Sequence, residues 1–376
     1  MSIVIKQLDK KRQLGKFVKF GIDLYKGNPY FCPPLIFDEK NTFKPIKNPA
    51  LEVCDYVLYM AYKDGRPAGR IAGIVNRRAN EKWNVKKCRF GWFDFIEDYE
   101  VFKALLDKVS EWGRQQGMDQ LNGPVGFTDF DHEGLLIEGY DYNAPMASLY
   151  NYPYYVDFFE RYGLEKEADW IEYQIQHPTD APERMKRVAK IVEERSHVHA
   201  VKVRNAKELV KRYGYTFFDV FDIAYQKLYN YQPMTERQKQ YYCQMYFPLV
   251  NYDFVTLVVN DDDKVVAVGV GMPSLSDALR KCRGRIFPLG WYYCIKALKA
   301  KKIDDFDLLL IAVLPEYQDK GINSLLFADM GPYFGKYQVQ RVETTSILET
   351  NLKNQANFAD LEKIQHKRRR AYQKSL

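Results

Sequence analysis

Long apolar segments and closely spaced cysteines are both missing from this chain of 376 residues. The longest strongly apolar run, residues 308–314, is far shorter than the ~20 residues that cross a bilayer, so we expect no membrane span. The N-terminal residues contain no extended apolar stretch, and we therefore expect no signal peptide and a cytoplasmic location. The six cysteines form no CxxC pair, which gives no indication of a zinc site or a disulfide framework.

Outside the C-terminal end of the chain, basic residues hardly outnumber acidic ones. The net charge is +7, and residues 361–376 contribute +5 of it, because six lysines and arginines stand there against Glu362 alone. A nucleic-acid-binding surface needs basic residues spread over a face, so we expect no nucleic-acid partner. A local cluster suits either one anionic group, such as a phosphate, or a solvated tail, and both interpretations stay open.

What the chain does contain is typical of a globular protein with two domains. Hydrophobic residues make up 46% and charged residues 28% of the sequence, and its length suits two domains of common size. Two prolines occur within residues 177–182, which breaks any regular element. We therefore predict an N-terminal domain over residues 1–178 and a C-terminal domain over residues 179–376.

The two halves show the same order of predicted elements. In each half two strands flank a tight turn, and a third strand, an amphipathic helix and a fourth strand follow. In the second half a capping box of Thr235 and Gln238 precedes this order. The first half comprises strands 56–62, 67–75, 89–96, 119–124 and 170–175, with helices 99–116 and 156–162. The second half comprises strands 253–260, 264–271, 307–314, 340–345 and 367–373, with helices 322–334 and 351–362.

The loop after the apolar strand at residues 307–314 carries the most informative motif. It reads Val-Leu-Pro-Glu-Tyr-Gln-Asp-Lys-Gly-Ile-Asn over residues 313–323 and leads into a predicted helix. A helix N-terminus presents backbone amides and a positive dipole end, which favour a phosphate group. Gly321 allows the backbone to turn and to approach a ligand closely. Gln318 and Gly321 match the GNAT acyltransferase signature (Q/R)-x-x-G-x-(G/A), whereas Asn323 departs from it. The loop therefore resembles a coenzyme A pyrophosphate loop.

The whole chain also resembles bacterial GNAT-like proteins of the YghO type. The matching phrases are Gly-Arg-Ile-Ala at 69–72, Asn-Arg-Arg-Ala-Asn at 76–80, Arg-Phe-Gly at 89–91, Gly-Pro at 123–124, Gly-Leu-Leu at 134–136, Tyr-Pro-Tyr-Tyr at 152–155, Pro-Ser-Leu-Ser at 273–276 and His-Lys-Arg-Arg-Arg at 366–370. The resemblance implies an α+β protein with two GNAT-like folds in tandem, each a mixed, mostly antiparallel sheet flanked by helices.

The same resemblance implies a cofactor, acetyl-CoA or another acyl-CoA, bound by the second half alone. The residues that would hold it are Ile311, Ala312, Val313, Gln318, Asp319, Lys320, Gly321, Ile322 and Asn323. The corresponding turn of the first half, residues 95–100, has no glycine and carries three carboxylates that would repel a pyrophosphate. We therefore expect the first half to lack a cofactor site.

Catalytic residues follow from the resemblance with one departure. A backbone amide of the fourth GNAT strand usually holds the thioester carbonyl, which implies residues 311–313 here. A tyrosine often protonates the leaving thiolate, but Phe358 stands near that position and cannot donate a proton. Tyr317 or water would then serve. Glu349 is a candidate base with Asn351 beside it, and a carboxylate at a helix N-terminus and an ordinary helix cap remain the alternatives.

Candidate residues for the acceptor come from two further segments. Asp129, Asp131 and His132 form a polar loop that could bind the acceptor or be a solvated surface turn. No second histidine lies nearby, so we expect no metal there. Ser274 and Ser276 follow a predicted strand and could line the acceptor side.

The sequence thus predicts an acyl-CoA-dependent N-acyltransferase, with a small-molecule or peptide amine as acceptor between the two halves. A non-catalytic protein that binds acyl-CoA or another ligand is one alternative, and an aminoacyl-tRNA-dependent transferase is another. The sequence predicts neither the acceptor nor the oligomeric state.

Overall fold

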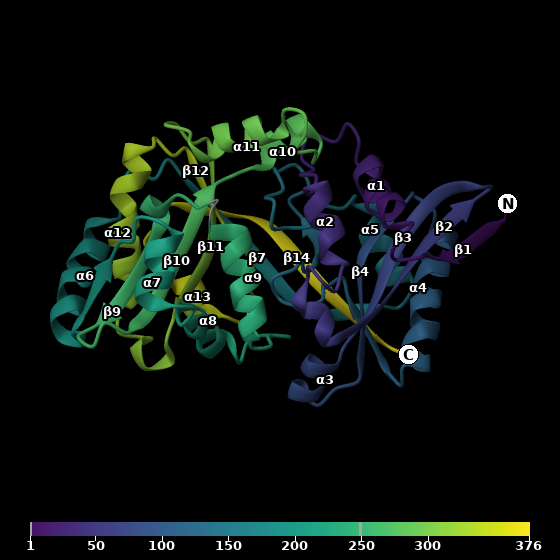
Figure 1. Ribbon diagram of the computed structural model, residues 1–376, viewed down its shortest axis with the longest axis horizontal. Helices are drawn as coiled ribbons and strands as arrows, with labels where there is room; N and C mark the ends of the chain where they lie inside the picture. Colours follow the sequence, from purple (N-terminus) through teal and green to yellow (C-terminus); the bar gives the residue numbers. More distant parts are fainter. Residues whose placement is uncertain (1, 248–249) are drawn as a thin grey trace. The chain divides into compact units, whose positions relative to one another are not determined.

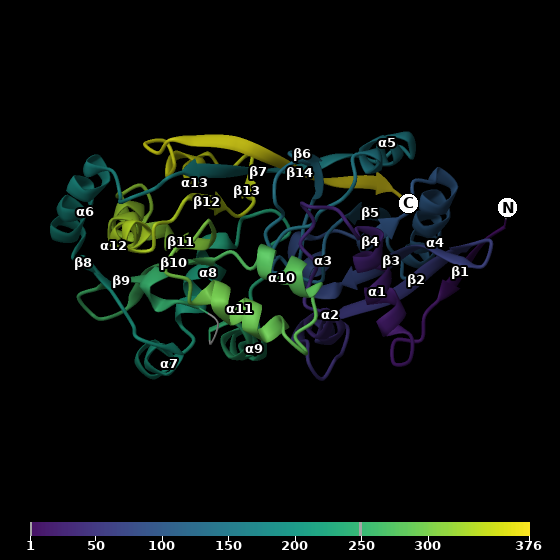
Figure 2. The ribbon, with the colours of Figure 1, turned by 90° about the horizontal axis from the view of Figure 1, so that it is seen from above.

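Strand β2 (Cys54–Lys63) shows how alternation builds the first unit. Its odd-numbered residues from Val57 to Ala61 pack in one core with helix α4 (Tyr99–Gln115), and its even-numbered residues from Tyr56 to Met60 pack in another with helix α1 (Leu14–Leu24). Successive side chains of a strand point to opposite faces, so one buried strand supplies two cores. Helices α4 and α1 accordingly cover opposite faces of this sheet (Figure 2).

The computed structural model describes residues 2–247 and 250–376 and divides the chain into two units. The first contains residues 1–171, 276–291 and 367–376, and the second contains residues 172–275 and 292–366. The predicted boundary at 178–179 thus lies seven residues beyond the boundary at 171–172 in the structure. The prediction also missed the two later segments, 276–291 and 367–376, that belong to the first unit. Among the described residues, no helix has the length and apolar character that crossing a membrane requires.

The first unit has a sheet in the order β1-β2-β3-β4-β5-β14 (Figure 1). Strands β1 to β4 pair antiparallel, whereas β4 and β5 pair parallel across helix α4. Its other elements are β1 (Ile3–Gln7), β3 (Arg66–Asn76), β4 (Lys87–Phe95), β5 (Gln120–Gly123), β6 (Leu135–Glu138), α2 (Ile36–Thr42), α3 (Arg77–Trp83), α5 (Tyr154–Arg161), α10 (Ser276–Cys282) and the short 3-10 helix η1 (Pro49–Glu52).

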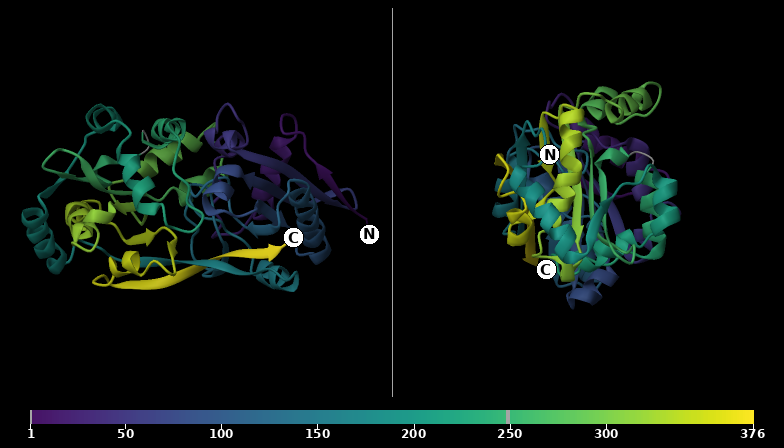
Figure 3. Two further views of the ribbon diagram at one scale, coloured as in Figure 1. Left: turned by 90° about the horizontal axis from the view of Figure 1, so that it is seen from below. Right: turned by 90° about the vertical axis from the view of Figure 1, so that its left-hand side faces the viewer.

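The second unit repeats this order with the sheet β7-β12-β11-β10-β9-β8. Strands β8 to β11 pair antiparallel, whereas β11 and β12 pair parallel across helix α12. Helices α6 and α12 lie on one face, and α8 packs on β10 and β11 from the other (Figure 3, right). Its elements are β8 (Val198–Val201), β9 (Val255–Asn260), β10 (Val265–Pro273), β11 (Asp305–Val313), β12 (Arg341–Thr344), β13 (Ile347–Leu348), α6 (Glu183–Ser196), α7 (Ala206–Tyr213), α8 (Phe217–Tyr225), α9 (Glu236–Tyr246), most of α11 (Gly290–Leu298), α12 (Ile322–Lys336), α13 (Leu352–Ala356) and the 3-10 helices η3 (Tyr252–Phe254) and η4 (Pro315–Tyr317).

Each unit is completed by a strand from the other half of the sequence. Strand β14 (Lys363–Ser375) pairs antiparallel with β5 through residues 372–375, in the first unit. Strand β7 (Glu165–Gln176) pairs antiparallel with β12 through residues 174–176, in the second unit. Strands β7 and β14 are neighbours in the strand order (Figure 3, left). The expectation that 170–175 closes the first half and 367–373 the second is therefore wrong, although both segments are strands.

The basic cluster of the chain is part of this strand rather than a tail. Arg368 and Arg370 both contact Asp169, which is only 1% exposed, at 3.2 and 2.8 Å. On the other face of β14, Arg369 donates to the carbonyl of Leu149 and is fully buried. Neither a phosphate site nor a solvated tail describes these arginines, because Asp169 pairs with two of them and the third donates to a backbone carbonyl within the first unit.

The predicted helix at residues 351–362 is much shorter in the structure. Helix α13 ends at Ala356, and Lys363 already begins β14. The capping box of Thr235 and Gln238 is confirmed at the start of α9. Helices α1, α2, α3, α7, α8, α10 and α11 were not predicted.

Removing residues 367–376 should unfold the first unit and leave the second folded. The deletion takes Tyr372 from the main core of the first unit and exposes the edge of β5. Loss of such an aromatic core residue alone costs about 3–5 kcal/mol. Hydrogen exchange read by mass spectrometry should show lost protection in α4 and retained protection in α12. Protection lost first in α12 would contradict this assignment of β14.

Candidate functional site

Strands β11 and β12 separate within the second unit and leave an opening. They pair in parallel from Asp305 with Arg341 to Leu308 with Thr344, and β11 then continues to Val313 without β12. The register of β11 with β10 skips Leu309, which is a β-bulge at the point of separation. A bulge bends its strand, so the extra residue at Leu309 accounts for the divergence of the two strands.

Side chains satisfy the carbonyl groups along the open edge of β11. The hydroxyl of Thr345 donates to Leu309 at 2.9 Å, that of Tyr225 to Ile311 at 2.7 Å, and the amide of Gln318 to Val313 at 2.9 Å. In an extended strand the N–H and C=O of one residue point to the same side. The amides of Ile311 and Val313 therefore face the opening, whereas that of Ala312 points toward β10.

The motif loop forms a turn that leads directly into α12. Residues 315–317 make the 3-10 helix η4, and Gly321 has a φ of 84° immediately before Ile322 begins the helix. No side chain caps this helix. The amide of Ser324 donates to the carbonyl of Gly321 at 2.9 Å, whereas the preceding amides, those of Ile322 and Asn323, face the turn where an anion could bind.

The role of Gly321 differs in part from the prediction. The turn is confirmed, because a φ of 84° is the left-handed region that favours glycine. A Cβ at this position would, however, lie 2.9 Å from Val188 and 3.1 Å from Val192 of α6. The missing side chain thus makes room for α6, and a substitution at Gly321 would disturb packing as well as any ligand.

The other polar residues of the loop have partners in the C-terminal segment. Asp319 forms an exposed ion pair with Lys353 at 2.5 Å, which offsets its charge beside the helix start. The amide of Asn323 donates to Asn357 at 2.7 Å. Lys320 is exposed and lies 5.3 Å from the ring centre of Tyr317. Lys320 is therefore the cation of this loop that has no carboxylate partner among the described contacts.

The corresponding helix of the first unit begins differently. The carboxylate of Asp98 accepts hydrogen bonds from the amides of Glu100 and Val101, at 3.0 and 3.3 Å. Lys63 forms an ion pair with the same carboxylate. The start of α4 is thus occupied by a carboxylate of its own chain.

The candidate catalytic residues Glu349 and Asn351 follow β12 and the short strand β13. Asn351 is a helix cap, since its side chain accepts from the amide of Asn354 at 3.2 Å. Glu349 is partly buried three residues before α13, and its backbone carbonyl accepts from Gln355. Phe358 is 2% exposed and packs against Phe327 and Tyr173. A hydroxyl at its position would therefore have to fit within the core.

The candidate acceptor residues do not form one group. Asp129, Asp131 and His132 lie in the first unit, where His132 contacts the carbonyl of Met146 at 3.0 Å. All three side chains are partly buried, and burial raises the pKa of Asp131 to about 6. Ser276 donates to the carbonyl of Ala144 at 2.7 Å and is buried, which is a structural role. Ser274 belongs to the second unit.

His132 instead lines a small cavity of about 50 Å³ within the first unit. Arg70 and Tyr25 contact Asp94 at its wall, at 2.7 and 2.9 Å, and Tyr155 lies 3.1 Å from Tyr25. Such a volume holds only a few water-sized groups. The cavity is a satisfied polar core rather than a site for an acceptor molecule.

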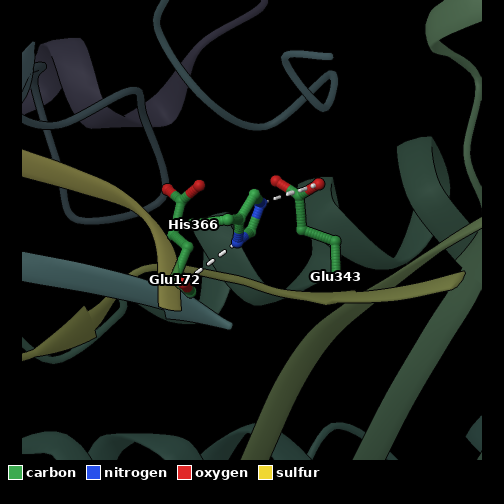
Figure 4. Close-up of side chains that lie close together, drawn as sticks. All are labelled: Glu172, Glu343 and His366. Atoms are coloured by element: carbon green, nitrogen blue, oxygen red, sulfur yellow. Dashed lines mark hydrogen bonds and ion pairs between the residues drawn. The ribbon is translucent and has the colours of Figure 1, made fainter. Parts of the chain in front are cut away.

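The spacing of residues in the sequence does not indicate a second group of polar side chains, which lies in the second unit. Glu172, Glu343 and His366 come from β7, β12 and β14, and their side chains lie together (Figure 4). Their positions are up to 194 residues apart in the chain. Glu343 is in register with Asp307, next to the last pair of β11 and β12 before the opening. No local motif marks such a group, because only the strand order brings it together.

Comparisons with known proteins agree with this architecture. No family model matches the chain. The protein YghO of Escherichia coli strain K12 is 26% identical over 373 residues, which cover 97% of this chain and 94% of the relative. A bacterial ceramide synthase of Caulobacter vibrioides is 23% identical over 376 residues, covering 97% and 95%.

Solved structures show the same tandem arrangement of elements. A tandem GNAT protein from the clavulanic acid biosynthesis pathway has a TM-score of 0.58 at 12% identity, covering 100% of this chain and 98% of the other. A GCN5-related N-acetyltransferase from Sphaerobacter thermophilus has a TM-score of 0.51 at 13% identity, covering 99% and 95%. The chain therefore carries two GNAT-like folds in tandem and resembles YghO over nearly its whole length.

Proposed function

We propose that this protein is an acyl-CoA-dependent N-acyltransferase, with its cofactor bound by the second unit. The observation that carries the proposal is the difference between the two equivalent helices. Helix α12 starts without a side-chain cap beside an opened strand, whereas the start of α4 is occupied by Asp98. A pyrophosphate requires converging amides that no carboxylate already occupies: Asp98 accepts from the first amides of α4, whereas the carboxylate beside α12, that of Asp319, is paired with Lys353.

In the proposed complex the pyrophosphate lies at residues 318–323 and the pantetheine arm runs between β11 and β12. The amide of Ile311 or Val313 donates to the thioester oxygen and stabilises the negative charge that develops on it. The amine attacks the carbonyl carbon, the C–S bond breaks, and Glu349 takes the proton of the amine. Tyr317 or water protonates the thiolate, because Phe358 cannot.

The nature of the acyl group and of the acceptor is part of the proposal. An acetyl group or a longer acyl group would fit the same pyrophosphate contacts, and the acceptor would be a small-molecule or peptide amine. A ceramide is a fatty-acid amide, so the name of the Caulobacter relative is consistent with amide formation. The burial of Phe358 favours one alternative, a protein that binds acyl-CoA without turning it over.

Reversing the charge of Lys320 should weaken coenzyme A binding by about tenfold or more. The Lys320→Glu variant places a carboxylate beside the pyrophosphate, and one unit charge at close range is worth about 1 kcal/mol or more at a protein surface. Because Lys320 is exposed, folding should be unaffected. Calorimetric titration with coenzyme A at physiological salt measures the change.

The matched control is Lys301→Glu, which gives the same net charge at another exposed position of the second unit. It should bind coenzyme A like the parent, since distant exposed charges are screened. Pantetheine, which lacks the phosphates, should bind all three proteins equally. Equal coenzyme A affinities for both variants would place the pyrophosphate elsewhere.

Glu349→Gln should lower the rate of acyl transfer and remove the acidic limb of its pH–rate profile. The amide cannot accept a proton, whereas coenzyme A binding does not involve it. Release of free thiol from acetyl-CoA against a panel of amines measures the rate. Glu316→Gln, an exposed change in η4, serves as the control. An unaltered profile would leave Glu349 as a residue of the helix start, and binding without any turnover would favour the non-catalytic alternative.

A further inference from the structure

The group of Glu172, Glu343 and His366 has the composition of a metal site. Each residue offers one ligand atom, and the three atoms all lie within 4.8 Å of one another. The side chain of His366 is fully buried, Glu172 is 0% exposed, and the side chain of Glu343 is 12% exposed. The imidazole lies between the two glutamate side chains (Figure 4).

A backbone carbonyl holds the imidazole of His366 through the ring nitrogen that faces away from Glu343. Nδ1 of His366 lies 3.1 Å from the backbone carbonyl of Glu172. A carbonyl only accepts, so Nδ1 carries the hydrogen, and Nε2 is left to face the Oε2 atom of Glu343 at 3.4 Å. Metal-binding histidines are typically held in this way, with the second ring nitrogen donating to a carbonyl or carboxylate.

Either a proton or a metal ion between Nε2 and the Glu343 carboxylate makes this contact favourable, because a bare lone pair facing an anionic oxygen is repelled. The 3.4 Å separation is longer than a well-formed N–H···O hydrogen bond. It agrees with the roughly 3.3 Å that separates two ligand atoms bound at ~2.0 Å in tetrahedral geometry. The hydroxyl of Ser346 donates to the Oε1 atom of Glu172 at 2.9 Å and holds the second carboxylate. A divalent cation would neutralise both buried carboxylates, whereas a proton on His366 neutralises only one.

We propose that Glu172, Glu343 and His366 bind one divalent transition-metal ion. An imidazole ligand favours zinc, copper, iron or nickel over magnesium or calcium, and the two carboxylates also suit manganese. Three protein ligands leave at least one coordination position for water or another small ligand, unlike a structural zinc site with four. The site does not depend on acyl transfer, so its test and that of the cofactor loop are independent.

Zinc binding to the full-length protein tests the proposal. Protein stripped with a chelator and then freed of it should bind one Zn²⁺ per chain in a calorimetric titration. Glu343→Gln keeps the shape of the side chain and should weaken binding at least tenfold, since even outer partners of a metal contribute 10–100-fold. His366→Ala should weaken it further. Manganese, followed by electron paramagnetic resonance, repeats the test with an ion that thiolates do not favour.

The matched control is His197→Asn. His197 also lies 3.4 Å from one carboxylate, that of Asp261, but both side chains are exposed, and no second carboxylate among the residues that the structure describes completes the set. This variant should bind zinc like the parent. Absence of stoichiometric binding to the parent, or equal binding by folded Glu343→Gln, would overturn the proposal and identify the group as a buried ion pair. If His366→Ala does not fold, Glu343→Gln decides the outcome.

Discussion

The structure depends on the exchange of closing strands between the two halves of the sequence. Each GNAT-like sheet needs a strand beside its parallel pair, and in each unit that strand is supplied by the other half. The exchange explains why the basic segment at residues 367–370 is buried. Asp169 stands on β7 where two arginines of β14 require a carboxylate, so the charges that complete the first unit are matched across adjacent strands.

The two units share one fold but differ in the chemistry at the start of one helix, α4 in the first unit and α12 in the second. Both place a helix after the third strand of an antiparallel set, and both return to a parallel strand. One helix start is satisfied by its own aspartate, and the other follows a glycine in the left-handed region. A difference of a few residues at one turn thus changes the chemistry of the helix start, while the surrounding sheets keep the same order.

Local patterns predicted most elements, because they report on a residue's near neighbours. The strand pairs around the tight turns, helix α4, helix α12 and the motif turn at Gly321 all follow from periodicity and turn chemistry. The partners of the closing strands could not be predicted, since pairing with β5 or β12 is decided about 165 to 250 residues away along the chain. The group of Glu172, Glu343 and His366 was missed for the same reason. The bulge at Leu309 has no signal in the local sequence.

Strand exchange also sets the order in which the chain can acquire its structure during synthesis. Strand β5 of the first unit is complete once residue 123 has been made, yet it lacks its partner until residues 372–375 appear. At the usual elongation rate of about 5–20 residues per second, this interval lasts roughly 12–50 s. Throughout it the edge of β5 has unpaired backbone groups, which are a template for wrong pairing. The nascent N-terminal half is therefore a natural client for chaperones on the ribosome, and its folding is completed only after translation of the second unit.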